Sequence, residues 1–258
     1  MNCIFVCTFG RPEYLEMLFL LLESVYKYGN IDCNTTEILI YTTSAFQKQI
    51  QESNLMSQLI RFEINDTYVS IEHACYARLD LFSLPSIHKY QTILYLDTDI
   101  IITQPLHTLF DEAICDVLYA GQEGTIDNAP PGDFWGCSLF GDEVHLYQDK
   151  SAFSSGILLF RNCDTIRTLF QNIIEDKNCR ISYQNNVYDQ PYIIYNAFKY
   201  NLYDNKTITK YITTNADDMS NDLMIHHFAG GPGNTSKLPR MQKYLHAKLA
   251  RQSINHVH

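Results

Sequence analysis

Two acidic residues interrupt an apolar run in the stretch "QTILYLDTDIIIT", residues 91–103. Asp97 and Asp99 stand one residue apart, directly after Leu96 and before three isoleucines. Because an unpaired buried carboxylate is costly, each acid needs a compensating partner or water. Two hypotheses follow. Either the strand ends at Leu96 and the acids face water in a turn, or the two carboxylates hold a divalent cation where a buried strand stops.

The elements that would position these acids alternate between strand and helix. Strand patterns occupy residues 2–9, 37–43, 59–65 and 92–96, and helical patterns occupy residues 11–29, 46–58 and 71–84. This alternation predicts an α/β fold with a central, mainly parallel mixed sheet flanked by helices. Ligands of such sheets bind beyond the carboxyl ends of the strands, and Asp97 and Asp99 lie at such an end.

The second half of the chain is less regular. Strands are expected at residues 116–121, 155–160 and 223–228, and helices at residues 162–177, 189–200 and 237–251. A loop-like segment, residues 122–150, contains the only tryptophan, Trp135, next to glycine. Long loops are usually functional, so we predict that this segment is a mobile lid at the acceptor site. No linker or repeat is visible, which favours one domain.

Composition excludes several classes of protein. The 258 residues carry a net charge of -10, which argues against nucleic-acid binding. Eight scattered cysteines form no C-x-x-C pair, so a zinc or redox motif is not expected. The start of the sequence shows no signal peptide pattern, and no apolar run reaches transmembrane length. The expectation is a soluble, reduced, cytoplasmic protein.

Four further motifs follow a fixed order around the D-x-D pair: "YARL" at 76–79, "FSSGILLF" at 153–160, "YDQPYIIYN" at 188–196 and "HHFAGG" at 226–231. Together they resemble glycosyltransferase family 8, whose members include glycogenin and bacterial lipooligosaccharide galactosyltransferases. The resemblance implies a single GT-A (Rossmann-like) domain that binds a nucleotide sugar and spans residues 1–258. Residues 1–103 would form a nucleotide-binding half that ends in D-x-D, and residues 104–258 an acceptor half.

The resemblance also implies an activity. A hexose, glucose or galactose, would pass from a UDP-sugar to a hydroxyl of a sugar, glycan or protein, with retention of anomeric configuration. The implied cofactor is Mn²⁺, with Mg²⁺ as second choice. Whether the chain forms a homodimer stays open.

Individual roles are implied for the residues that match the family motifs. The implied catalytic pair is Asp189 and Gln190. The implied metal ligands are Asp97, Asp99 and His227. The implied contacts of the nucleotide sugar are Thr8, Tyr14, Arg78, Asp97, Thr98, Ser155, Gly156, Gly230 and Lys237.

The chain departs from the family pattern at two places. Ser154 stands where members often have Asn, which puts the choice of donor sugar in doubt. In the closing motif, Gly233 stands where members commonly have Lys, and the next lysine is Lys237. Either Lys237 reaches the diphosphate across a longer glycine-rich loop, or backbone N–H groups take that task.

Other interpretations of the same residues stay open. Neighbouring strand residues face opposite sides, so only one of His226 and His227 can enter the site, and the family match favours His227. Asp189 could cap the helix that follows it. A haloacid-dehalogenase-like phosphatase also ends a strand with D-x-D, and Asp217-Asp218 could mimic its later acids. A nucleotide-sugar-binding protein without transfer activity is a third alternative.

Overall fold

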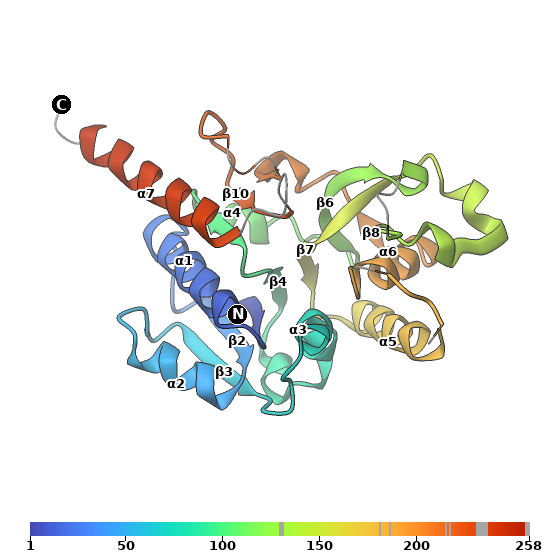
Figure 1. Ribbon diagram of the computed structural model, residues 1–258, viewed down its shortest axis with the longest axis horizontal. Helices are drawn as coiled ribbons and strands as arrows, with labels where there is room; N and C mark the ends of the chain where they lie inside the picture. Colours follow the sequence, from blue (N-terminus) through green and yellow to red (C-terminus); the bar gives the residue numbers. More distant parts are fainter. Residues whose placement is uncertain are drawn as a thin grey trace.

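The central sheet of the computed structural model has seven strands in the order β3-β2-β1-β4-β7-β6-β8 (Figure 1). The structure describes residues 1–128, 132–180, 182–185, 187–214, 216, 218–230 and 237–255, with side chains as far as Arg251. The strands of this sheet are β1 (Asn2–Thr8), β2 (Thr36–Thr42), β3 (Ile60–Ile64), β4 (Thr92–Leu96), β6 (Leu118–Thr125), β7 (Ser151–Arg161) and β8 (Tyr203–Asp204). Only β7 runs against its neighbours, so the mainly parallel mixed sheet expected from the sequence is confirmed.

Helices and short 3₁₀ turns connect and cover the strands. The α-helices are α1 (Pro12–Tyr28), α2 (Ser44–Glu52), α3 (Ile71–Tyr76), α4 (His107–Phe110), α5 (Asp164–Cys179), α6 (Gln190–Lys199) and α7 (Lys237–Asn255). The 3₁₀ helices are η1 (Ala77–Ser83), η2 (Pro85–Lys89), η3 (Ile126–Asn128), η4 (Cys137–Leu146) and η5 (Thr209–Tyr211). Among the described residues, no helix combines the length and apolar character needed to cross a membrane.

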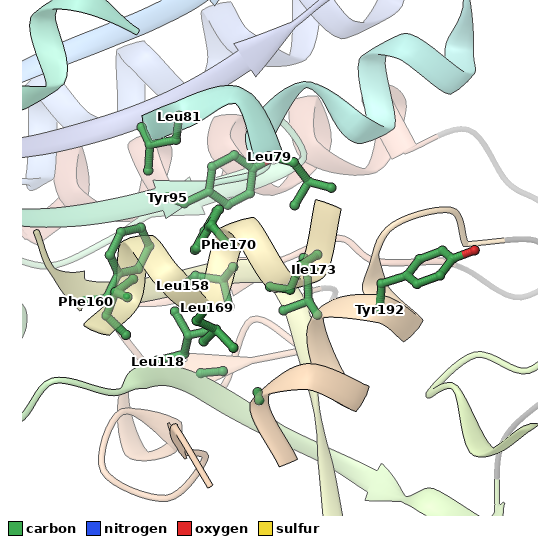
Figure 2. Packing of buried hydrophobic residues seen from close by; sticks show 14 of the residues in the cluster. Leu79, Leu81, Tyr95, Leu118, Leu158, Phe160, Leu169, Phe170, Ile173 and Tyr192 are labelled. Carbon is green, nitrogen blue, oxygen red and sulfur yellow. The ribbon is translucent and has the colours of Figure 1, made fainter. Parts of the chain in front are cut away.

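Two hydrophobic clusters cover the two faces of the sheet. Alternate residues of β1 point to opposite faces, so Phe5 joins one cluster and Val6 the other. The Val6 cluster includes the apolar face of α1, where Leu18 and Leu22 recur at helical spacing. Figure 2 shows part of the Phe5 cluster, in which Leu169, Phe170 and Ile173 of α5 pack near strand residues Leu158 and Phe160. Packing on both faces therefore fixes the sheet and, with it, the positions of the residues at its edge.

A second, three-stranded sheet brings the end of the chain to the D-x-D pair. Its order is β5-β10-β9, with bounds Ile100–Ile102, Ile225–His227 and Ile212–Thr213. In this sheet His227 pairs with Ile100, the residue after Asp99. Helix α7 lies against α1 (Figure 1), and Met17, Phe228 and Tyr244 share one small apolar cluster there. Residues far apart in sequence thus meet beside Asp99.

Three element predictions require correction. The helix expected over 46–58 spans Ser44–Glu52, because Thr43 accepts a hydrogen bond from Phe46 N–H and starts the helix earlier. The helix expected over 71–84 is split into α3 and the 3₁₀ helix η1. The segment 122–150 is not simply a loop, since β6 continues to Thr125 and both η3 and η4 follow.

Candidate active site

Backbone hydrogen bonds fix Asp97 and Asp99 between the two sheets. The N–H of Asp97 donates to the carbonyl of Gly156 on β7 at 2.8 Å. The carbonyl of Asp99 accepts from the N–H of Phe228, just beyond β10, at 2.9 Å. Asp99 is only 4% exposed, whereas the Asp97 side chain is 29% exposed. The acids are therefore not turn residues that simply face water.

The three expected metal ligands converge on one point. One ligand atom each of Asp97, Asp99 and His227 can be chosen so that all lie within 4.8 Å of one another. His227 Nε2 lies 3.5 Å from Asp99 Oδ1. His227 is 3% exposed, so its ring is buried. Two carboxylates and one imidazole close together at a strand end form a donor set that fits a divalent cation.

Gly156 leaves the space in which these ligand atoms meet. A Cβ atom at this position would lie 2.6 Å from His227 Cε1 and 2.8 Å from Asp97 Oδ2. Such distances are too short for any side chain, so the glycine is required by the close approach of Asp97 and His227. Gly156 of the Ser-Gly motif, which is predicted to contact the donor, therefore leaves the space that the candidate metal site needs.

Lys237 provides the positive charge beside Asp99 in this structure. Its Nζ atom lies 2.5 Å from Asp99 Oδ2. Burial alone would raise the pKa of Asp99, but the charges of Lys237 and His227 more than offset burial and lower that pKa. In turn, Asp99 raises the pKa of Lys237. Lys237 thus lies at the acid pair and contacts Asp99, and its contact with a diphosphate stays a prediction.

Arg78 connects the D-x-D pair to the predicted catalytic acid. Its Nε atom lies 2.7 Å from Asp189 Oδ2 and its Nη1 atom 3.4 Å from Asp97 Oδ1. Nη1 also donates to the carbonyl of Ser155 at 2.5 Å. Arg78 is 8% exposed, so its guanidinium is a built part of the site and not an ordinary surface cation.

Asp189 is a buried acid with a perturbed pKa. It is 1% exposed, and burial raises its pKa to about 6, while the charge of Arg78 opposes this rise. The carboxylate is therefore ionised at neutral pH and close to its titration range. Asp189 occupies the N-cap position of α6, but its side chain forms no capping hydrogen bond there. Perturbed buried acids of this kind are common at catalytic sites.

Gln190 lies next to Asp189 but already uses its amide group within the protein. Its Oε1 accepts from the Ser155 N–H at 3.0 Å and the Ser155 hydroxyl at 3.1 Å. Its Nε2 donates to the carbonyl of Phe134 at 3.1 Å. In this conformation Gln190 ties β7 to the segment around Trp135.

The segment around Trp135 is anchored at several points. Trp135 is buried, and its ring lies directly over Gly124, where any side chain would collide with it. Asp133 accepts from the N–H of Ser138 and from the hydroxyl of Tyr183. Residues 129–131 of this segment lie outside the described residues. Trp135 is thus a packed core residue in this structure, and the mobility of the segment stays a prediction.

A cleft with a volume of about 150 Å³ opens beside the acids. Its walls come from the ends of β1 and β4 and from α1, α3, η1 and α7, and the lining residues are Cys7, Phe9, Tyr14, Met17, Ala74, Cys75, Arg78, Tyr95, Asp97, Thr98, Asp99 and Lys237. Five predicted site residues, Tyr14, Arg78, Thr98, Asp99 and Lys237, thus share one cleft with Asp97.

Four predicted donor contacts do not line this cleft: Thr8, Ser155, Gly156 and Gly230. Thr8 is buried at the end of β1, and its hydroxyl has no hydrogen-bond partner among the described residues. Gly230 follows β10 with φ 60°, and its carbonyl accepts a hydrogen bond from Arg240. Gly231 and Gly233, which belong to the same predicted motif, lie outside the described residues.

The two adjacent histidines face opposite sides of β10, as expected. His226 Nε2 lies 3.0 Å from the Leu223 carbonyl and 3.0 Å from the Tyr244 hydroxyl, away from the acids. Burial lowers the pKa of His226 to about 4, so this ring is neutral. His227 alone reaches the acid pair, and the sequence-based choice between the two is confirmed.

Sequence reasoning missed Tyr95. Its hydroxyl donates to Asp97 Oδ1 at 2.5 Å, and its ring lies 4.5 Å from the Arg78 guanidinium carbon. The sequence spacing could have predicted this contact, because residues two apart on an extended strand point to the same face. Tyr95 and Asp97 have that spacing.

Comparison with solved structures defines the class of the protein. The galactosyltransferase LgtC, solved in complex with donor and acceptor sugar analogues, is similar with a TM-score of 0.64 and 17% identity over 96% of each chain. Mouse xyloside xylosyltransferase 1, in its apo form, is similar with a TM-score of 0.62 and 12% identity over 92% of this chain and 99% of that chain. The apo form of the glycosyltransferase GlyE of Streptococcus pneumoniae TIGR4 gives a TM-score of 0.58 and 16% identity over 99% of this chain and 63% of that chain. The fold is the GT-A fold of nucleotide-sugar transferases.

The sequence itself gives the family. The model of glycosyl transferase family 8 matches residues 12–175, and the chain belongs to this family and is a glycosyltransferase. No curated protein sequence matches the chain. The phosphatase alternative is wrong on fold and family. That alternative needed a second acid pair, Asp217 and Asp218. Asp217 lies outside the described residues, and Asp218 accepts a hydrogen bond from the Ser220 hydroxyl on the surface.

Proposed function

We propose that this glycosyltransferase is metal-dependent and retaining, and that it moves a hexose, glucose or galactose, from a UDP-sugar to a hydroxyl acceptor. The observation that carries the proposal is the convergence of His227 with Asp97 and Asp99, the two acids that line the cleft. An anionic diphosphate approaching two carboxylates is repelled unless a cation lies between them. The family match supports a nucleotide sugar as the donor.

The residues present fit a divalent cation. Asp97, Asp99 and His227 would hold it, and the absence of a side chain at Gly156 leaves room beside Asp97 and His227. The mixed oxygen and nitrogen donor set favours Mn²⁺, with Mg²⁺ as second choice. When bound, such an ion supplies positive charge that stabilises the departing diphosphate.

The walls of the cleft are proposed to bind the UDP part of the donor. Tyr14 on α1 would stack on the uracil, and Thr98, next to Asp97, would approach the ribose or phosphate. Lys237 would leave Asp99 and pair with the diphosphate, because its long side chain is 40% exposed and can rotate. Thr8, Ser155, Gly156 and Gly230 stay proposed donor contacts that lie outside the lining of this cleft.

Arg78 and Asp189 are proposed to act at the sugar. In a retaining transfer the acceptor bonds to the face that the nucleotide leaves, and positive charge develops at the anomeric carbon. The Asp189 carboxylate, held by Arg78 at 2.7 Å, would stabilise that charge because it is ionised and buried. Gln190 would position Ser155 and Gly156 beside the donor.

The two halves of the chain are proposed to divide the work. Residues 1–103 carry Tyr14, Arg78 and the D-x-D pair and would bind the nucleotide. Residues 104–258 carry Asp189 and would bind the acceptor. LgtC is described as a galactosyltransferase, which supports galactose among the hexoses. Ser154, buried beside Ser155, stands where many members have Asn and is the residue most suited to alter donor choice.

Incubation with a panel of UDP-sugars plus Mn²⁺ tests the proposal. UDP release and the intact mass of the protein are measured for each donor. The expected result is UDP release with UDP-glucose or UDP-galactose above that with any other donor. Added mass would show that the protein is its own acceptor. A preference for a GDP-, CMP- or dTDP-linked sugar would contradict the donor assignment.

A further inference from the structure

The two oxygens of the Asp97 carboxylate lie in different surroundings. Oδ1 accepts a hydrogen bond from the Tyr95 hydroxyl at 2.5 Å and lies 3.4 Å from Arg78 Nη1. Oδ2 lies on the other side, next to the space above Gly156. A Cβ atom at Gly156 would lie 2.8 Å from Oδ2 and 2.8 Å from His227 Nε2. One oxygen is therefore held by the protein, and the other faces the candidate metal site.

The position of the Tyr95 hydroxyl is fixed by its ring. Tyr95 is 4% exposed and belongs to the apolar cluster that also contains Leu79 and Leu158 (Figure 2). Its ring centroid lies 5.9 Å from that of Phe5 on the neighbouring strand. Because close packing restricts the ring, the hydroxyl has little freedom to follow a moving carboxylate.

The same ring also supports Arg78. The guanidinium carbon lies 4.5 Å from the ring centroid, a cation–π arrangement, while Nε holds Asp189. A tyrosine hydroxyl can donate one hydrogen bond, and that of Tyr95 is directed at Asp97 Oδ1. A metal-ligating carboxylate is commonly oriented by a hydrogen bond of this kind to its second oxygen.

We infer that Tyr95 is a positioning residue of the transfer site: its hydroxyl holds Oδ1 of Asp97 so that Oδ2 is presented to the cation. This inference rests on the metal-dependent function proposed above. It assigns a role in metal affinity to Tyr95, the second residue before Asp97. The ring beside Arg78 would remain when only the hydroxyl is removed.

The test compares two Tyr→Phe variants that lose similar hydrogen bonds. Tyr95→Phe removes the hydroxyl on Asp97 and keeps the ring under Arg78. Tyr90→Phe is the matched control, because the buried Tyr90 donates to Glu37 Oε2 at 2.7 Å, away from the cleft residues. Free Mn²⁺ is measured by electron paramagnetic resonance during titration of each full-length protein. Thermal melting in chelator checks the fold.

We expect Tyr95→Phe to bind Mn²⁺ about tenfold or more weakly, since loss of such an orienting group typically lowers metal affinity 10–100-fold. Tyr90→Phe is expected to bind as wild type does, although both variants melt at somewhat lower temperature. If Tyr95→Phe does not fold, Tyr95→Leu replaces it in the titration.

The outcomes separate the two proposals. Equal Mn²⁺ affinity of wild type and Tyr95→Phe would overturn the role of Tyr95 and leave the metal site standing. An equal loss in Tyr90→Phe would also overturn it, because the effect would then be one of general stability. No saturable Mn²⁺ binding by wild type would overturn the metal site, and the role of Tyr95 with it.

Discussion

The Nζ atom of Lys237 lies 2.5 Å from Oδ2 of Asp99, within the cluster proposed to hold a metal. Lys237 begins α7, and Asp99 follows β4, so the contact joins the end of the chain to its first half. A side-chain cation thus compensates the buried Asp99 charge in this structure. Under the proposed function, Lys237 would leave Asp99 for the diphosphate, and a metal would take over its charge.

Lys237→Met should separate these two roles of the lysine. We expect UDP affinity with Mn²⁺ to fall about tenfold, as for loss of one charge-assisted contact. Without metal, the free energy of unfolding should fall by about 1 kcal/mol, because the lysine side chain is 40% exposed and solvent screens the pair. Calorimetric UDP titration and urea unfolding measure the two effects. Lys243→Met, an exposed lysine on the same helix, is the control, and an equal effect there would contradict the assignment.

Arg78→Met should be among the most damaging single changes in the site. It leaves Asp189 buried without its cation, and breaking a buried pair in this way costs about 3 kcal/mol or more. It also removes the hydrogen bond to the Ser155 carbonyl. We expect transfer to fall at least about a hundredfold, with Arg78→Lys intermediate because it keeps only the charge. Wild-type turnover by Arg78→Met would contradict the link between Arg78 and Asp189.

The raised pKa of Asp189 predicts a specific pH dependence. Its folded pKa is about 6, above the usual value near 4, so between these pH values the folded state binds more protons than the unfolded state. The contribution of Asp189 to stability is therefore greatest at low pH and is lost as pH rises from about 4 to about 6. Over this range, Asp189→Asn should gain about 2–3 kcal/mol relative to wild type.

Urea unfolding of both proteins across this pH range measures the difference. Transfer should rise through pH 6 as the carboxylate ionises, which is the opposite direction to stability. A constant difference between wild type and Asp189→Asn would show that the Asp189 pKa is not raised in the folded protein.

Gly156→Ala should fill the space beside Asp97 and His227 without changing any charge. The added methyl would meet the His227 ring and Asp97 Oδ2 within 2.8 Å, so His227 or Asp97 must shift. We expect Mn²⁺ binding to be lost and stability to fall by about 1–3 kcal/mol. Gly121→Ala on the neighbouring strand β6 is the control, since its methyl meets the flexible end of Ile212 at 3.2 Å. Retained Mn²⁺ affinity in Gly156→Ala would place the metal elsewhere.

Local periodicity was sufficient to predict much of the fold and part of the site. Alternation of strand and helix predicted the parallel sheet, and the end of β4 located the acid pair. The period of two along β10 correctly separated His226 from His227. The same period places Tyr95 and Asp97 on one face of the strand. Because Tyr95 lies in an apolar strand, only its burial was predicted.

Other features depend on distant residues and have no local signal. The burial of Trp135 has no local signal, because it depends on the space that Gly124 of β6 leaves for its ring. The contact of Lys237 with Asp99 depends on how α7 packs against α1. The helix expected over 71–84 changes to a 3₁₀ helix at Ala77. The sequence could not predict this change, because apolar residues every three or four positions suit both kinds of helix.

The central claim is that Asp97, Asp99 and His227 hold a divalent metal without which no sugar is transferred. The most direct measurement is UDP release from the preferred UDP-sugar by metal-stripped protein, before and after addition of Mn²⁺. Wild type is compared with Asp97→Asn, Asp99→Asn, His227→Ala and, as the matched control on the opposite face of β10, His226→Ala. We expect activity to depend on Mn²⁺, to be nearly abolished in the first three variants and to be largely kept per folded molecule in His226→Ala. Full activity of the wild type in chelator would contradict the metal, and an inactive His226→Ala beside a normal His227→Ala would contradict its ligands.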